Sequence, residues 1–415
     1  MPVSRDAAVE VDVPRRQRRL HSPIGSRRWV TTLAALTGTT ALSIDMSLPA
    51  QPTLAREFAV APETAQLSLG LYLAGFALGQ LVVGSLSDAL GRRRVLIAGL
   101  AVFTGAGVAC AAAPSIAILL AARVVQGFGS AAAPVISRAM VRDTHPAASA
   151  ARTLSTIMAV LAVAPMLAPA LGGVLLTHLG WEAIFATLAA IGVAFSALAV
   201  FTLPETLAPE RRVPLSFAAT LAGYARFFRT PGTRIPTLLV CLSFAGQFAF
   251  IAASPVVLID GFGVAPDHFG FYFGAAALAL MLGSITGRRR LAGQPPARVL
   301  ASGALLLCVA GLLAAIGVHW PETGRLGLVA PVVIYFLGVG LTSPSATAIA
   351  MHPVPEIAGA ASAMIGALTM LSGAVSGFVT TLIGGSDPRT LGLVMGGAGL
   401  AAAAVVARSK LAATG

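Results

Sequence analysis

Lysine is almost absent from this chain of 415 residues. The only one is Lys410, and the residue that follows it is Leu411. A Walker A phosphate-binding loop needs a lysine followed by serine or threonine. The chain therefore lacks this nucleotide site, and we expect it to work without ATP.

Cysteine and clustered histidine are also scarce. Cys110, Cys241 and Cys308 lie far apart in apolar runs without the spacing of metal ligands, so we interpret them as small buried hydrophobes. The sequence contains no nucleophile elbow and no metal triad. We therefore expect no disulfide framework, no metal, no cofactor and no enzymatic activity.

Charge is rare, whereas long apolar runs dominate. Hydrophobic residues make up 56% of the chain and charged residues 11%, with a mean hydropathy of +0.85. A helix needs about 20 apolar residues to cross about 30 Å of hydrocarbon, and a barrel strand only about ten. The runs predict an all-α membrane protein with roughly twelve spans. We place the spans at residues 29–50, 65–87, 95–113, 116–138, 153–177, 182–203, 235–258, 267–287, 297–318, 325–348, 358–384 and 389–407.

Arginine indicates the orientation. Most of the 28 basic residues fall in the N-terminal tail, in every second loop and at the C-terminus. Because cytoplasmic loops carry this excess, we expect both termini on the cytoplasmic side of the membrane. The same distribution accounts for the formal net charge of +12 without a nucleic-acid partner. Trp29, Trp181 and Trp320 fall at predicted span ends, where we expect aromatic anchors.

A degenerate repeat divides the chain into halves. Residues 84–96 and residues 283–300 each combine a Gly-Ser pair with a following run of arginines. Two repeated halves that enclose a midplane site are the architecture of many secondary transporters. The expected organisation is a cytoplasmic tail at 1–28, six-helix bundles at 29–203 and 235–407 joined by a cytoplasmic loop at 204–234, and a cytoplasmic tail at 408–415.

Asp45 is the one acidic residue, of sixteen, that lies well inside a predicted span. A carboxylate there costs roughly 2.5 to 3.5 kcal/mol and normally marks an ion or substrate path. Asp45 is therefore our first candidate for a proton carrier. Because it lies in the outer half of its span, a residue near the interface or an ion pair at a helix end is the alternative.

The loop after the second span carries the most specific motif. Residues 84–96 read GSLSDALGRRRVL, which closely resembles the signature G-x-L-S-D-x-x-G-R-R-x-x-L of the major facilitator superfamily. The resemblance implies a cytoplasmic gate that includes Gly84, Asp88, Gly91, Arg92 and Arg93. Glycines let helix ends pack closely, and Asp88 can pair with arginines or with a helix N-terminus.

A second motif lies in the fourth span. Residues 123–127 read RVVQG, similar to the R-x-x-Q-G motif of the same superfamily, which implies that Arg123 takes part in proton coupling. Arginine stays protonated, so it would tune a carboxylate rather than carry the proton. Snorkelling of Arg123 to the interface is the alternative.

The fifth span resembles the antiporter motif G-P-x-x-G-G. Residues 164–173 read APMLAPALGG, with Ala168 in place of the first glycine. The resemblance implies an outward-directed exchanger rather than a symporter. Pro165, Pro169, Gly172 and Gly173 predict a bent, tightly packed helix, and ordinary small-residue packing is the alternative.

The first span narrows the resemblance to a subfamily. Residues 45–49 read DMSLP, similar to the D-M-x-L-P segment of the Bcr/CflA-type drug and proton antiporters, where tyrosine is common at the position of Ser47. The resemblance implies proton-coupled export of drugs or other small amphipathic compounds, of the bicyclomycin, phenicol or sulfonamide type, by alternating access. It also implies a monomer in a bacterial inner membrane, whose partners are protons, the lipid bilayer and a small-molecule substrate.

Aromatic and amide side chains in central spans are candidates for a substrate cavity. We expect it to include Gln66, Leu69, Tyr72, Gln126, Gln247, Phe250 and Tyr335. Two other functions stay open: a proton-coupled uptake symporter for a sugar or amino acid, and a non-transporting membrane receptor on this fold.

Overall fold

The computed structural model describes residues 22–161, 164–317, 324–384 and 387–409. These residues fold almost entirely as helices, and no strand occurs among them. The predicted all-α fold is therefore confirmed.

Among the described residues, the first half of the chain forms ten helices and the second half forms seven. The ten are α1 (Arg27–Thr37), α2 (Thr39–Asp45), α3 (Gln51–Glu57), α4 (Pro62–Leu90), α5 (Arg92–Ala111), α6 (Ile116–Ser130), α7 (Ala132–Thr144), α8 (Ala147–Leu161), α9 (Ala164–Leu179) and α10 (Trp181–Thr202). Short turns lie at Leu48–Ala50 and Pro209–Arg211.

The second half forms seven further helices. They are α11 (Phe217–Arg229), α12 (Arg234–Pro255), α13 (Phe269–Leu291), α14 (Pro296–Gly317), α15 (Leu326–Met351), α16 (Ala358–Leu382) and α17 (Pro388–Arg408). A π-helical turn at Val256–Gly261 extends α12. A short turn at Pro355–Ile357 precedes α16.

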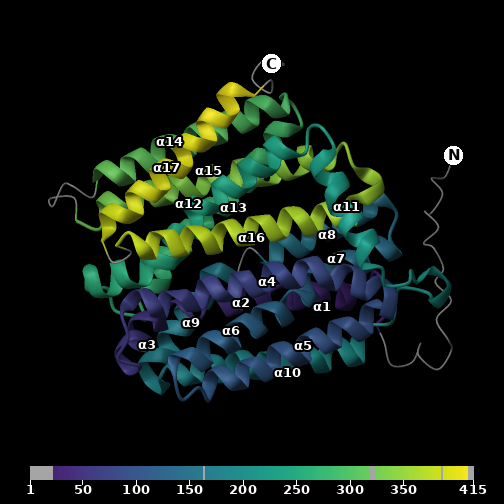
Figure 1. Ribbon diagram of the computed structural model, residues 1–415, viewed down its shortest axis with the longest axis horizontal. Coiled ribbons are helices and arrows are strands. Elements are labelled where there is room, and N and C mark those ends of the chain that lie inside the picture. Colours follow the sequence, from purple (N-terminus) through teal and green to yellow (C-terminus); the bar gives the residue numbers. More distant parts are fainter. Residues whose placement is uncertain (1–21, 162–163, 318–323, 385–386, 410–415) are drawn as a thin grey trace.

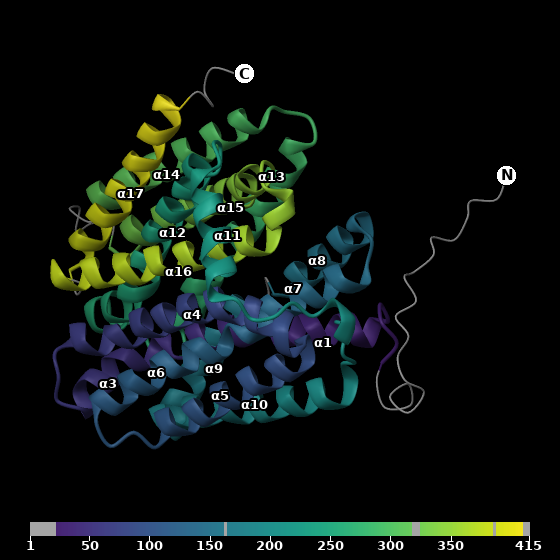
Figure 2. The same cartoon turned by 45° about the vertical axis from the view of Figure 1, so that its right-hand side comes forward.

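The two sets of helices lie on opposite sides of the molecule. In Figures 1 and 2 the helices α1 to α7, α9 and α10 gather below and the helices α12 to α17 gather above, whereas α8 reaches up to the level of α16. Helices α4 and α16 lie side by side at the boundary in both views. Helices α9 and α13 meet across the same boundary.

Ten described helices are long and apolar enough to span a membrane. The first predicted span is divided, because α1 and α2 meet at Gly38 and α2 ends at Asp45. The fifth is divided between α8 and α9, and residues 162–163 lie outside the described residues. The loop predicted at 204–234 contains a helix, α11, that the apolar runs did not reveal.

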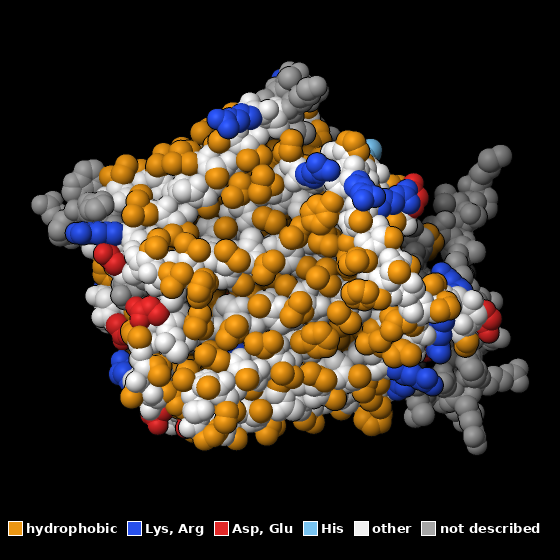
Figure 3. All heavy atoms as spheres, in the orientation of Figure 1, with side chains coloured by type: hydrophobic (Ala, Val, Ile, Leu, Met, Phe, Trp, Pro, Cys, Tyr) orange, Lys and Arg blue, Asp and Glu red, His pale blue; other side chains and the backbone are white. Residues whose placement is uncertain are grey.

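Large apolar side chains cover the outside. Leu78, Phe201, Leu305 and Leu382 are each more than half exposed, as expected for side chains that face lipid. Figure 3 shows such side chains across the middle of the molecule and most of the blue arginines toward its right-hand end. We call the end that carries Arg92, Arg93, Arg142 and Arg288–Arg290 the basic end.

The prediction that tryptophans anchor the span ends at the membrane interface is wrong for two of the three. Trp29 is fully buried and stacks on His145, with 5.6 Å between ring centroids. Trp181 is 6% exposed and packs between Phe58 and Phe185. Both rings fill helix junctions inside the first set of helices rather than the lipid interface. Trp320 lies outside the described residues.

Candidate functional site

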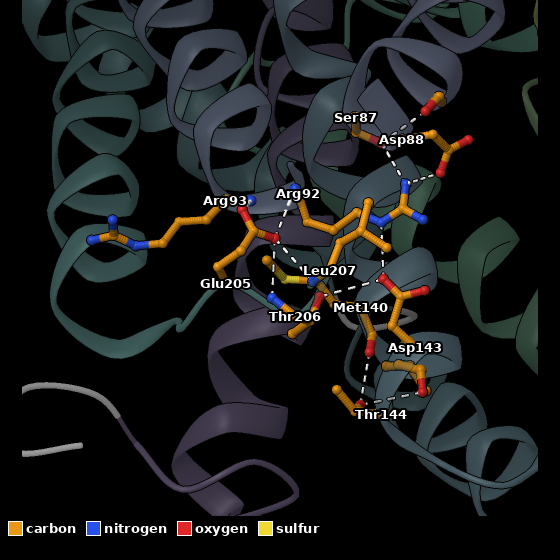
Figure 4. A network of polar contacts seen from close by, with 12 residues as sticks. Ser87, Asp88, Arg92, Arg93, Met140, Asp143, Thr144, Glu205, Thr206 and Leu207 are labelled. Carbon is orange, nitrogen blue, oxygen red and sulfur yellow. Dashed lines mark hydrogen bonds and ion pairs between the residues drawn. The ribbon is translucent and has the colours of Figure 1, made fainter. Parts of the chain in front are cut away.

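A network of charges at the basic end joins α4, α5 and α7. The Arg92 guanidinium pairs with Asp88 at 2.5 Å and with Asp143 at 2.9 Å, and it donates to the Ser87 hydroxyl at 2.7 Å (Figure 4). Arg92 is 8% exposed, so these bonds neutralise a nearly buried cation. The Arg93 side chain extends away and donates to the Val200 carbonyl at 2.7 Å.

Glu205 caps the start of α5. Its carboxylate accepts from the backbone N–H groups of Arg92 at 2.9 Å, Arg93 at 3.3 Å, Thr206 at 3.0 Å and Leu207 at 3.1 Å (Figure 4). The first N–H groups of a helix have no partner within the helix and carry partial positive charge, so a carboxylate there is stabilising. Glu205 thus ties the segment after α10 to the loop before α5.

Gly91 makes this approach possible. It has φ +100°, and a Cβ atom on it would lie 2.5 Å from Glu205 Oε2. Gly84, the first glycine of the same motif, has no heavy atom within 4 Å of a Cβ position. Only Gly91 of these two glycines is therefore required by close packing in this conformation.

Sequence reasoning did not single out Asp143 or Glu205. Asp143 follows Arg142 in a basic loop, and Glu205 lies in the Pro-Glu-Thr that we treated as part of a linker. The available signal for Glu205 is an acid that directly follows a span and stands apart from the next charge, Glu210. Neither sequence position reveals that both acids converge on Arg92.

Arg123 lies in the interior and is fully buried. It donates to the Ser68 carbonyl at 3.4 Å, the Ser43 hydroxyl at 3.1 Å, the Ser47 hydroxyl at 3.2 Å and Gln126 Oε1 at 2.7 Å. Its guanidinium carbon lies 4.3 Å from the ring centroid of Tyr72. Hydroxyls, carbonyls and an aromatic face therefore hold this cation, rather than a carboxylate.

Arg123 binds one side of α2 and of the turn that follows it, and Asp45 lies on the opposite side. Residues two apart on an α-helix point about 200° apart, whereas residues four apart share a face. Ser43 and Ser47 face Arg123, so the Asp45 side chain leaves the chain on the far side. Asp45 is 4% exposed, and within the described residues its carboxylate has no hydrogen bond or ion pair.

Helix α9 is packed through its glycines on two sides. A Cβ atom on Gly172 would overlap the Met46 carbonyl, next to Asp45, and one on Gly173 would overlap the Pro266 carbonyl, just before α13. Ala170 meets Gly270 of α13 in the same way. Pro169 lies inside α9, and Pro165 lies in its first turn. The two sets of helices therefore touch here without room for a side chain.

The expected cavity residues divide into groups. Gln66 and Leu69 line a groove of about 200 Å³ between α4 and α16, where Gln66 Oε1 accepts from Thr381 at 3.0 Å. Tyr72 and Gln126 contact Arg123. The remaining three are buried in the second set of helices: Gln247, Phe250 and Tyr335.

A larger cavity opens between the two sets of helices at the basic end. Its volume is about 540 Å³, and its walls come from α4, α7, α11 and the start of α16. Tyr224 of α11 lines it and donates to the Leu81 carbonyl at 2.6 Å. Burial raises the pKa of the Tyr224 hydroxyl, so the group remains a donor.

Known proteins resemble this chain over most of its length. Residues 33–377 match the family described as the Major Facilitator Superfamily. The "Uncharacterized MFS-type transporter YdgK" of Bacillus subtilis (strain 168) is 35% identical, covering 88% of this chain and 91% of the relative. The "Bicyclomycin resistance protein homolog" of Haemophilus influenzae is 30% identical, covering 84% and 87%. The crystal structure of a D-xylose-proton symporter superposes with a TM-score of 0.72 at 16% identity, covering 92% and 98%, and shows the fold.

Proposed function

This chain belongs to the Major Facilitator Superfamily, and from this we propose that it is a proton-coupled exporter of drugs or similar small amphipathic compounds. Similarity to a bicyclomycin resistance protein homolog along 84% of the chain supports a drug as substrate. We propose no catalytic activity, because the family transports its substrates unchanged.

The burial of the Asp45 carboxylate without a partner is the observation that supports the coupling mechanism. It is a carboxylate in the interior with 4% exposure and no partner among the described residues. Burying an unpaired charge costs several kcal/mol, so such a group exchanges a proton readily when its surroundings change. We propose that Asp45 releases its proton as substrate binds and is reprotonated from the other side of the membrane.

Arg123 would act on Asp45 through the helix that both residues share. Arg123 binds Ser43 and Ser47, which flank Asp45 in sequence. A shift of the end of α2 would therefore move the Asp45 carboxylate and strain these bonds at the same time. We propose that this link couples protonation to the position of α2, with no direct ion pair needed.

The cycle we propose is a rocking of two bundles, residues 29–203 and 235–407, in a monomer. We call the end of the molecule where Gly173 of α9 meets Pro266 the α9 end. In the state described here the α9 end is packed shut, and the basic end holds the cavity of about 540 Å³. We propose that the protein lies in a bacterial inner membrane, with the basic end, the gate around Asp88 and both termini on the cytoplasmic side. A pH difference of one unit supplies about 1.4 kcal/mol and 100 mV about 2.3 kcal/mol per charge, which suffices for uphill exchange.

Drug susceptibility tests the proposal. Efflux-deficient cells that express the wild type should survive higher concentrations of bicyclomycin, phenicols or sulfonamides, and Asp45→Asn should remove this protection. Asp267→Asn is the matched control, because Asp267 is an exposed acid outside the helices. If the wild type protects against no compound and instead accumulates a sugar or amino acid, the uptake symporter replaces the exporter.

A further inference from the structure

The cavity at the basic end has an unequal set of charges. We call it the vestibule; its lining includes five charged side chains, namely Asp88, Arg92, Arg138, Arg142 and Glu356. Three are cationic and two are anionic. Which of them are free to meet a ligand depends on the pairs that they already form.

Both acids of the vestibule are already paired. Asp88 pairs with Arg92, and Glu356 pairs with Arg226 of α11 at 3.1 Å. Asp143, which lies near Arg142, binds Arg92 at 2.9 Å. Asp143 and Asp88 act on the charge of Arg142 through space, but among the described residues no acid forms an ion pair with the two remaining arginines.

Arg138 and Arg142 are those remaining arginines. They are four residues apart in α7, so they point to the same face, toward the vestibule. Within the described part of the chain neither forms a hydrogen bond or an ion pair. A guanidinium group can donate two parallel N–H bonds to a carboxylate or another planar oxyanion, and two such groups lie a helical turn apart here.

The surroundings suit the rest of an amphipathic molecule. Val135, Val213, Leu215 and Ile357 supply apolar wall, and hydroxyls of Ser216 and Thr220 supply hydrogen-bonding groups. In the interior of the first set of helices, Arg123 is a third cation that no carboxylate contacts among the described residues. These cations favour anions over cations.

We propose that the vestibule selects substrates that carry an oxyanion, such as a carboxylate, sulfonate or deprotonated sulfonamide, and that Arg138 and Arg142 bind this group first. This inference rests on the proposed export function and specifies its substrate class. Neutral compounds of the same shape are admitted more slowly, and amines are disfavoured.

Transport of three analogues tests the inference. The analogues share one aromatic scaffold and differ only in a carboxylate, an amide or an amine. Export is measured in phosphatidylcholine vesicles that contain the full chain as wild type, as Arg138→Gln/Arg142→Gln, or as the charge-retaining Arg138→Lys/Arg142→Lys. Arg298→Gln is the matched control, because it removes a cation from an exposed position that does not line the vestibule.

The double glutamine variant should lower kcat/KM for the carboxylate by about tenfold or more and leave the amide within about twofold. The lysine variant keeps the charge but not the planar guanidinium, so it should lose less of the preference for the carboxylate than the glutamine variant. Arg298→Gln should keep the wild-type preference. An equal loss for all three analogues would mean that the arginines act only in the gate, and no loss for the carboxylate would mean that they do not meet substrate; either result overturns the inference.

Lipid gives a further way for the inference to fail. If the double variant differs from wild type only in vesicles that contain phosphatidylglycerol, the arginines bind a lipid headgroup rather than substrate. The proposed function fails separately, because a wild type that exports none of the analogues and confers no drug resistance is not an exporter. Export of all three analogues without charge preference would refute the inference alone.

Discussion

Glu205 is the residue on which the start of α5 depends. Its carboxylate accepts four backbone N–H groups, among them those of Arg92 and Arg93. Glu205→Gln keeps the shape and removes the charge, so we expect a loss of about 1 to 2 kcal/mol in the free energy of unfolding. Thermal unfolding in detergent measures it. Glu210→Gln is the control, because Glu210 is exposed and caps no helix of the membrane domain; equal melting of the two variants would contradict the assignment.

Gly91 and Gly84 belong to the same motif but differ in what they tolerate. Gly91→Ala places a Cβ atom against Glu205 at a φ of +100°, which we expect to cost about 1 to 2 kcal/mol. Gly84→Ala meets nothing within 4 Å and gains helix propensity, so it should be neutral or stabilising. The two melting temperatures give the comparison, and a tolerated Gly91→Ala would refute the role given to this turn.

At the residue scale the sequence identifies which residues are functional candidates, but not the direction in which their side chains point. Asp45 and Arg123 were found because a charge inside a span is costly enough to demand a reason. That they lie on different sides of α2 depends on the phase of a helix that stops at Asp45, and an apolar run does not carry this information. The role of each in coupling stays a prediction.

Helix α9 gives a prediction at the scale of an element. Gly173→Val would push the Pro266 backbone away and favour the state in which the α9 end is open. Spin labels on Glu57 and Asp267, both at that end, should then report a longer distance than in the wild type. Gly397→Val in α17 is the control, because nothing lies within 4 Å of its Cβ position. An unchanged distance would mean that this contact does not hold the end shut.

Elements were predictable in proportion to their apolar length. The long helices from α12 to α17 follow apolar runs of about 20 residues, and their bounds lie within a few residues of expectation. The 13-residue helix α11 was missed because it is short and lies in an interval rich in arginine and proline. The divided first span was missed because Gly38 and the turn before Pro49 interrupt the helix without interrupting the apolar run.

At the scale of the molecule, packing rather than charge closes the α9 end. The bridge from Arg56 to Asp260 joins the two sides at 3.3 Å, but its side chains are 67% and 40% exposed. An exposed pair of this kind contributes about 1 kcal/mol at most. Arg56→Gln should therefore change stability and transport little, whereas the close contact of α9 with α13 resists separation.

The same pair of positions permits a test of rocking. A short crosslink between Arg56→Cys and Asp260→Cys, in a chain whose Cys110, Cys241 and Cys308 are replaced by serine, should stop transport, and a reducible linker should restore it on cleavage. The single-cysteine variants treated with the same reagent are the controls. Full transport in the crosslinked protein would contradict alternating movement of the two bundles.

The central claim is that Asp45 carries the proton that is exchanged for substrate. The most direct measurement follows proton movement with a pH-sensitive dye in sealed vesicles of purified protein when an exported drug is added. The account predicts a drug-dependent proton flux for the wild type and for Asp267→Asn, and none for Asp45→Asn, although the variant still binds drug. A flux in Asp45→Asn equal to that of the wild type would contradict the account.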